Sequence, residues 1–218
     1  MKKKILLGIF ALAVAFQAGA QDKAFNFGFK VAPAISWLSI DSQSYETDGS
    51  AAKCNWGFFG AWNFTENLSV VSGFNVNFLG GNYKLVSAKS SLVDVTGYSP
   101  STPNININKT NKIRLGELEL PVAFQMRTND INDFKFYVQI GLASGYIFRA
   151  KGKDDKNIDN RHLNTSYFVA GGVEYAVTGG VSLIGQLKYN GGLTSVMSTS
   201  HFAKTKANFV ELGLGVMF

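Results

Sequence analysis

Two glutamates, Glu117 and Glu119, have the residue type and the spacing most suited to chemistry in this sequence. Side chains two residues apart on a β-strand lie on the same face, and a pair of carboxylates at one site is what glycoside hydrolysis uses. The alternative is that this pair, with Glu174 and Glu211, neutralises lysines and arginines inside the fold, because an unpaired buried charge is costly. We favour this second interpretation.

The other reactive side chains are isolated. His162 and His201 fall in predicted loops, and the sequence has no HxH, HExxH or Cys/His cluster of the kind that binds zinc. Asp154, Asp155 and Asp159 are close together, but their spacing is not that of an EF-hand calcium loop. A Gly-x-Ser-x-Gly motif is also missing. We therefore predict no catalytic, cofactor-binding or metal-binding residue, and no enzyme.

Cysteine and charge exclude two further classes. Cys54 is the only cysteine, so the chain cannot form an internal disulfide, which excludes a disulfide-stapled scaffold. It is in phase with Trp56 and Phe58, and we expect it on the same apolar face. The formal charge is +6, but no clustered basic stripe accompanies an RNA- or DNA-binding motif, so nucleic acid is not an expected partner.

The N-terminus has the pattern of a secretory signal peptide. Three lysines at residues 2–4 precede an apolar run at 5–16 and a small-x-small cleavage site at 18–20. The run is too short for a transmembrane helix. We predict that residues 1–20 are cleaved and that 21–218 form a single domain beginning at Gln21. Without the three lysines the formal charge falls from +6 to +3.

The last residues of the sequence indicate the kind of secondary structure that positions the charged side chains discussed above. Two rows alternate with a period of two, which is typical of a β-strand. About ten residues is the length of a tilted bilayer crossing, whereas no run of about 18 apolar residues follows the leader to form a helical span. The apolar row contains Val210, Leu212, Leu214, Val216 and Phe218, and the other row contains Phe209, Glu211, Gly213, Gly215 and Met217.

Eight segments share this alternation, and the connections between them alternate in length. Short connections on one side and long ones on the other are typical of bacterial outer-membrane barrels. We predict an all-β fold, an eight-stranded antiparallel up-and-down transmembrane β-barrel. The segments are 25–38, 53–64, 68–83, 112–127, 133–150, 163–177, 181–191 and 207–218; the short connections are 65–67, 128–132 and 178–180, and the long ones are 39–52, 84–111, 151–162 and 192–206.

The interior of an eight-stranded barrel is just filled by side chains, so we expect little or no open channel. Ile113 and Leu115 have the opposite phase to the apolar row that follows them, which predicts a β-bulge near Gly116. The expected inward charges, which should form ion pairs, are Lys30, Arg127, Lys135, Arg149 and Lys188 with Glu117, Glu119, Glu174 and Glu211. The aromatic residues expected in interfacial girdles are Phe25, Trp37, Trp62, Tyr146, Tyr167, Tyr189 and Phe218.

Several stretches resemble one known family along essentially all of residues 21–218. They are Leu118-Glu119-Leu120-Pro121-Val122, 137–141, 171–175, 187–193 and 212–218. With these stretches, the chain resembles the PorT-like outer-membrane β-barrel proteins of Bacteroidota. The resemblance implies a barrel in the outer membrane. Members of that family include factors in protein secretion and gliding.

Together these patterns predict a non-enzymatic outer-membrane barrel. We expect a monomer that acts as a surface scaffold, a binding protein or a component of secretion-type envelope machinery. The expected partners are the lipid bilayer, lipopolysaccharide and another envelope protein, which would bind through the 84–111 loop because loops on a rigid scaffold carry function. The alternatives are a small pore, a lipid-modifying outer-membrane enzyme, and a soluble lipocalin-type barrel, which would need an apolar interior.

Overall fold

The computed structural model describes residues 24–41, 45–85, 110–152, 160–177, 180–197 and 204–218. Within these ranges the chain forms nine strands in one sheet. No helix in the described part of the chain is long and apolar enough to cross a membrane. The strands are β1 (Phe25–Ile40), β2 (Tyr45–Gly49), β3 (Ala51–Asn63), β4 (Leu68–Leu85), β5 (Asn111–Arg127), β6 (Phe134–Lys151), β7 (Leu163–Ala176), β8 (Ser182–Gly192) and β9 (Thr205–Met217).

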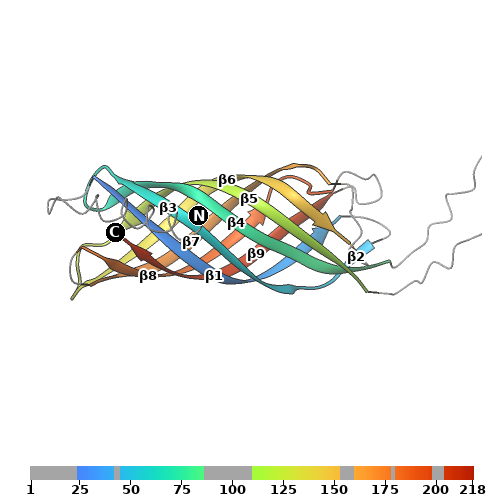
Figure 1. The fold of residues 1–218 in the computed structure, drawn as a ribbon, viewed down its shortest axis with the longest axis horizontal. Helices are drawn as coiled ribbons and strands as arrows, with labels where there is room; N and C mark the ends of the chain where they lie inside the picture. The colour runs from blue at the N-terminus through green and yellow to red at the C-terminus, as the bar shows by residue number, and fades with distance from the viewer. Residues whose placement is uncertain (1–23, 42–44, 86–109, 153–159, 178–179, 198–203) are drawn as a thin grey trace, which may run out of the picture.

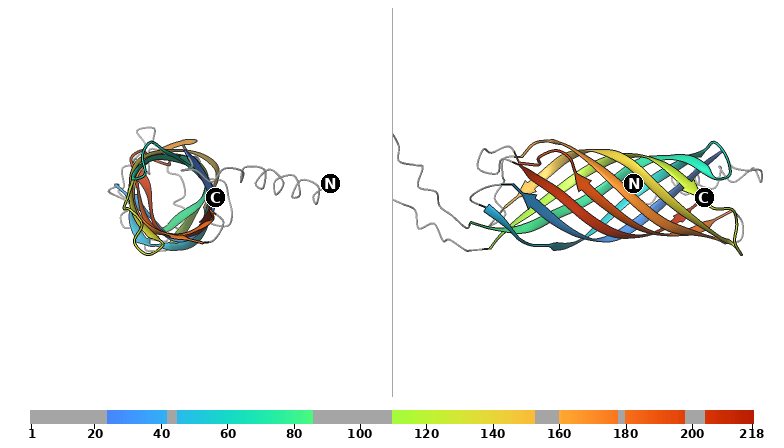
Figure 2. Two further views of the ribbon diagram at one scale, coloured as in Figure 1. Left: turned by 90° about the vertical axis from the view of Figure 1, so that its left-hand side faces the viewer. Right: turned by 180° about the vertical axis from the view of Figure 1, so that it is seen from behind.

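Eight of these strands close into a barrel (Figure 1). Each barrel strand pairs antiparallel with its neighbours along the chain, and β1 pairs with β9 to complete the ring, as the end-on view in Figure 2 shows. The predicted barrel is confirmed, and each of its strands lies close to its expected range. The ninth strand, β2, pairs with the end of β4 and was not predicted. Its five residues fall inside the expected 39–52 loop and are too few for a clear alternation.

The two ends of the barrel differ in their connections. At the short-turn end, Asn132 and Asp133 have positive φ angles of 51° and 68°, a conformation that Asn and Asp side chains tolerate. Phe27 and Phe218 exchange backbone hydrogen bonds of 2.8 and 3.2 Å at this same end. The strand ends that flank the connections expected to be long lie at the opposite end, which we call the loop end (Figure 1).

The outer wall of the barrel is apolar. Large hydrophobic side chains are exposed on every one of the eight barrel strands. So large an apolar surface is not compatible with water but matches a lipid bilayer. The predicted orientation is therefore confirmed, and the lipocalin-type alternative is wrong. Examples of these side chains are Ile35, Phe58, Phe74, Val122, Phe124, Ile140, Val169, Leu187, Leu212 and Leu214.

Aromatic side chains lie at both edges of this wall. At the short-turn end, Phe25 and Trp62 are exposed. Towards the loop end, the ring of Tyr189 lies 6.3 Å from that of Trp37 and 6.2 Å from that of Tyr167, measured between centroids. Rings of this kind occupy the lipid–water interface of membrane barrels, so the two sets match the predicted girdles.

The bulge lies close to its predicted position but on the neighbouring strand. The pairing of β5 with β6 shifts between Gly116 and Glu117, and the extra residue is Phe148 of β6. The reason given for the bulge was wrong, because β5 does not change phase. Ile113 and Leu115 face inward together with Glu117, since the barrel has an apolar interior at the loop end.

Candidate functional site in the barrel lumen

The inward row of β5 shows how the lumen is layered. From the short-turn end it begins with a charged and an amide side chain, continues through small residues to two glutamates, and ends with two aliphatic residues at the loop end. Since the alternation of inward and outward side chains along β5 is unbroken, these residues share a face. In order they are Arg127, Gln125, Ala123, Pro121, Glu119, Glu117, Leu115 and Ile113.

A buried ion-pair layer occupies the middle of the lumen. The Lys188 ammonium lies 3.2 Å from Glu119 and 3.8 Å from Glu211, and the Lys30 ammonium lies 3.4 Å from Glu211. The side chains of Lys188 and Glu119 are only 2% and 1% exposed. Four strands on opposite walls supply these groups, so the layer connects the two sides of the barrel.

Amide side chains complete the coordination of the two carboxylates. Asn55 donates to Glu211 at 2.9 Å, while Asn75 and Asn190 donate to Glu119 at 2.8 and 3.3 Å. A buried ion pair is tolerated only when further hydrogen bonds satisfy its remaining lone pairs. This layer meets that condition, and it therefore holds the strands in one arrangement.

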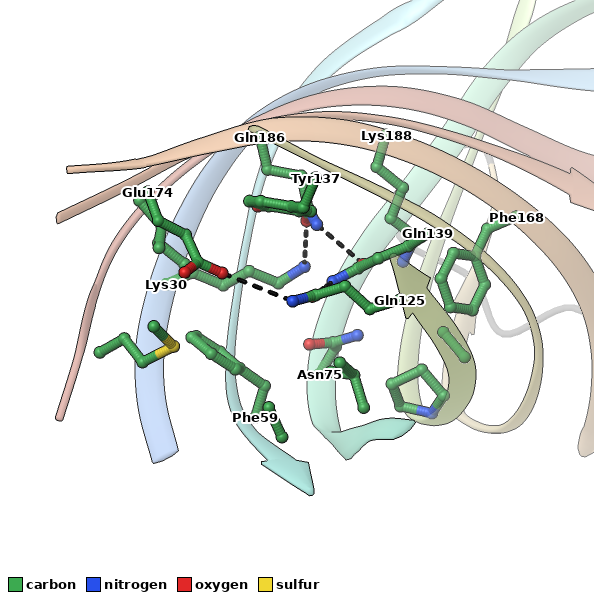
Figure 3. A pocket seen from close by; sticks show the side chains of 16 residues that line it. Lys30, Phe59, Asn75, Gln125, Tyr137, Gln139, Phe168, Glu174, Gln186 and Lys188 are labelled. Atoms are coloured by element: carbon green, nitrogen blue, oxygen red, sulfur yellow. Dashed lines mark hydrogen bonds between the residues drawn. The ribbon is translucent and has the colours of Figure 1, made fainter. Parts of the chain in front are cut away.

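A second charged layer lies nearer the short-turn end. Arg127 pairs with Glu174 at 3.5 Å and also donates to Asn63. A chain of amide hydrogen bonds connects the two layers (Figure 3). It runs from Lys30 to Gln186 (3.1 Å), Gln186 to Gln139 (2.9 Å), Gln139 to Gln125 (2.6 Å) and Gln125 to Glu174 (3.4 Å).

A cavity of about 40 Å³ lies beside this chain, lined by Tyr137, Gln139, Phe168 and Gln186 among others (Figure 3). A buried water needs roughly 10–15 Å³ of such volume and two to four polar partners. The space is therefore suited to a few water molecules.

Above the ion-pair layer the interior becomes apolar. Glu117 accepts a hydrogen bond from Asn164 at 3.0 Å, and within the described residues no cation lies within 4 Å of it. Its cross-strand neighbour Asn77 is buried with neither amide atom hydrogen-bonded to a described group. Beyond them lies an apolar cluster of Leu38, Leu79, Ile113, Leu115, Ile147, Ala150, Val196, Met197, Ala207 and Phe209.

Val196 and Met197 come from the connection between β8 and β9 and are almost fully buried. The backbone of Val196 bonds to Arg161 at 3.1 Å and to Thr205 at 2.8 Å, so the segment is tied to two neighbouring parts of the chain. Sequence reasoning placed it in the 192–206 loop and missed this role. The signal was an apolar Val-Met pair between the polar residues 194–195 and 198–201.

The predicted inward charges divide into three groups. Glu119, Glu174 and Glu211 form the expected ion pairs with Lys30, Arg127 and Lys188, whereas Glu117 pairs with an amide. Lys135 lies at the short-turn rim, where it is 35% exposed and pairs with Asp130 at 3.4 Å. Arg149 is exposed, which is contrary to the prediction because the bulge at Phe148 reverses its direction.

The other candidate side chains that the structure describes are His162 and Cys54, and among the described residues neither forms a hydrogen bond or an ion pair with an acidic, basic or nucleophilic side chain. His162 is exposed, stacks on Tyr146 with ring centroids 5.6 Å apart, and has Nδ1 3.4 Å from the Ile147 carbonyl oxygen. Cys54 is exposed, as expected for the apolar face. Among the described residues no group of three or more His, Cys, Asp or Glu side chains could hold a metal ion. His201, Asp154, Asp155 and Asp159 lie outside the described residues.

Comparisons with known proteins agree with this geometry. NspA, a Neisserial surface protein, has a TM-score of 0.53 and 17% identity, covering 89% of this chain and 96% of that one. The outer membrane protein OprG from Pseudomonas aeruginosa has a TM-score of 0.50 and 11% identity, covering 90% and 97%. At these identities the likeness shows the fold alone. A search of curated proteins finds no match.

Residues 17–198 match a family described as the outer membrane protein beta-barrel domain. That match covers most of the chain and agrees with the lipid-facing apolar wall and the filled lumen. The chain belongs to the outer membrane protein beta-barrel domain family, and it is a protein of the outer membrane.

Proposed function

We propose that this protein is a non-enzymatic, non-conducting barrel that presents a binding surface outside the cell. It acts as a surface scaffold or as a component of secretion-type envelope machinery, as its resemblance to PorT-like proteins implies. The observation that carries the proposal is the filled lumen: the layer around Lys188 and the apolar cluster beyond it occupy successive levels of the barrel. A rigid, filled barrel is a suitable platform for loops that bind partners.

The arrangement of the acids argues against an enzyme. Glu119 and Glu211 are almost completely buried and already engaged by cations and amides. Glu117, one level nearer the loop end, is buried to a similar extent and accepts a hydrogen bond from Asn164. A hydrolase would need its carboxylates to reach a substrate and a water, and these three carboxylates are enclosed by the barrel wall.

The same layers argue against a small pore. An ion that crossed the lumen would have to break the pairs of Lys188 and then pass the apolar cluster around Phe209. Both steps are costly, because the first separates buried charges and the second moves an ion through an apolar space. Planar-bilayer recording tests this point: we expect no steady single-channel steps.

The loop end supports a role in binding. Strands β4 and β5 contain 18 and 17 residues, whereas a bilayer crossing needs only about 9–11. They extend past the bilayer and carry the 84–111 connection, where we place the site for another envelope protein; residues 86–109 lie outside the described part of the chain. We also propose that the protein reaches the membrane by cleavage of residues 1–20, which lie outside the described residues as well, and that it is a monomer.

The experiment is deletion of residues 98–108 in affinity-tagged protein expressed in its own host. We expect the barrel to remain heat-modifiable on gel electrophoresis while the recovery of one envelope protein is lost. A deletion of residues 154–158, in the connection between β6 and β7, serves as the matched control and should leave that recovery unchanged. Equal recovery of the same protein with both deletions would contradict the proposed binding site.

A further inference from the structure

Basic side chains gather at the loop end of three strands; those of β5 and β6 lie on the outer wall, whereas Lys53 of β3 is in the inward-facing row with Asn55. We define the basic patch as Lys53 of β3, Lys112 and Arg114 of β5, and Arg149 of β6. The side chains of Lys112, Arg114 and Arg149 are exposed, and Lys53 is partly exposed. Arg114 is paired in register with Lys151, and Arg149 with Gly116, so the two guanidinium groups belong to adjacent positions of neighbouring strands.

The basic patch begins where the lipid-facing wall ends. Phe78 of β4, Leu118 of β5 and Phe148 of β6 are the last large apolar side chains exposed on these strands. Arg149 directly follows Phe148. Arg114 lies four positions beyond Leu118, which is about 13 Å along the strand and about 10 Å along the axis of a barrel with tilted strands. The positive charges therefore lie at the level of the lipid headgroups.

The bulge of β6 gives Arg149 its place in the basic patch. Inward residues of β6 are odd-numbered up to Ile147, so a regular strand would turn Arg149 into the barrel. The extra residue Phe148 shifts the phase and directs Arg149 outward. Gly116 on β5 accommodates this arrangement, because a Cβ there would lie 2.8 Å from the Phe148 ring and 3.4 Å from the Arg149 Cβ.

The charges of the basic patch repel one another. Both Arg114 and Arg149 exert a repulsive Coulombic effect on Lys53. Within the described residues no acidic side chain forms an ion pair with Lys53, Lys112 or Arg149. On the adjoining β2, Asp48 is engaged by Lys84 at 3.8 Å and by Thr110 at 2.5 Å. The positive charges of Lys112 and Arg149 attract an anion.

We propose that the basic patch binds the phosphate groups of lipid A, the membrane anchor of lipopolysaccharide. This inference rests on the proposed function, because it needs the loop end to face the outer leaflet. The guanidinium group of Arg149 suits a phosphate, since it can donate two parallel hydrogen bonds to its oxygens, and the Lys112 ammonium supplies a second positive charge. The apolar wall below the basic patch, with Phe148 at its edge, lies where the acyl chains of the same lipid run.

The test measures binding of lipid A to the full-length protein in detergent, by native mass spectrometry. Diphosphorylated and chemically dephosphorylated lipid A are compared on the wild type, on the double variant Lys112→Gln/Arg149→Gln and on a control, Lys135→Gln, at the opposite rim. We expect the wild type and the control to prefer the phosphorylated lipid. The double variant should bind it about tenfold more weakly, which corresponds to the loss of two solvent-exposed ion pairs.

Two outcomes would overturn the inference: equal binding of both lipid A forms to the wild type, or equal binding of phosphorylated lipid A to the double variant and the control. Phosphatidylglycerol and inorganic phosphate are added as competitors, and displacement by either at equal concentration would show general anion binding instead. Heat-modifiable migration of the double variant confirms its folding. The pull-down with the 98–108 deletion tests the proposed function independently of these lipids.

Discussion

Replacing Lys188 by methionine tests whether the ion-pair layer holds the barrel together. The substitution keeps most of the side-chain volume and removes the charge. Glu211 retains Lys30 at 3.4 Å and Asn55 at 2.9 Å. Glu119 retains its amide donors Asn75 and Asn190, but no other described cation lies within 4 Å of it.

Glu119 thus loses its ion pair and keeps only the more distant Lys30 as a counter-charge; breaking a buried pair costs about 3–5 kcal/mol. A typical folded domain has a free energy of unfolding of about 5–15 kcal/mol, so the loss is a large fraction of the total. In the double variant Lys188→Met/Glu119→Gln both charges are absent and the amide contacts have a neutral partner. We expect it to recover most of the lost stability.

The assay is urea unfolding of protein reconstituted in lipid bilayers, followed by the fluorescence of its three tryptophans. Lys135→Met is the matched control, because that lysine pairs with an exposed aspartate at the rim and should contribute no more than about 1 kcal/mol. If Lys188→Met and Lys135→Met unfold at the same urea concentration, the ion-pair layer is not the stabilising element that we infer. Failure of the double variant to exceed the single variant would contradict the charge argument.

Three further predictions concern the wall, the glycines and the apolar cluster. Val122→Arg should destabilise the barrel in bilayers by about 2–4 kcal/mol because it places a charge against lipid, whereas Val122→Leu should be nearly neutral; equal unfolding midpoints would refute this. Gly145→Ala should cost about 1–3 kcal/mol since its Cβ would collide with the Glu117 carboxylate; Gly213→Ala, whose Cβ would have its nearest contact at 3.5 Å, should unfold like the wild type in the same urea titration. Phe209→Ala should cost about 3–5 kcal/mol through the cavity that it leaves, and an unchanged midpoint would show that the apolar cluster is not tightly packed.

The wall and most of the ion pairs were predictable because each depends on a period of two. Leu118, Leu120 and Val122 form an apolar row that faces lipid. The alternate residues Glu117 and Glu119 of the same strand must then face inward. Closure of the sheet follows because no edge can remain unpaired in lipid.

What was missed depends on contacts between distant segments. The place of the extra residue on β6 is set by pairing with β5, so the alternation of β5 alone could not locate Phe148 or turn Arg149 outward. The burial of Val196 and Met197 depends on Phe209 and other residues of the apolar cluster. The PorT-like relationship, the envelope partner and the leader peptide at residues 1–20 stay predictions.

Even-numbered residues of β5 face lipid, whereas odd-numbered ones face a filled lumen. Spin labels attached at Val122→Cys, Phe124→Cys, Ala123→Cys and Gln125→Cys, in a Cys54→Ser background, measure this directly in bilayers through collisions with dissolved oxygen and with a water-soluble nickel reagent. We expect frequent oxygen collisions at 122 and 124, with few collisions of either kind at 123 and 125. Frequent oxygen collisions at 123 and 125 instead, or frequent nickel collisions at 122 and 124, would contradict this orientation.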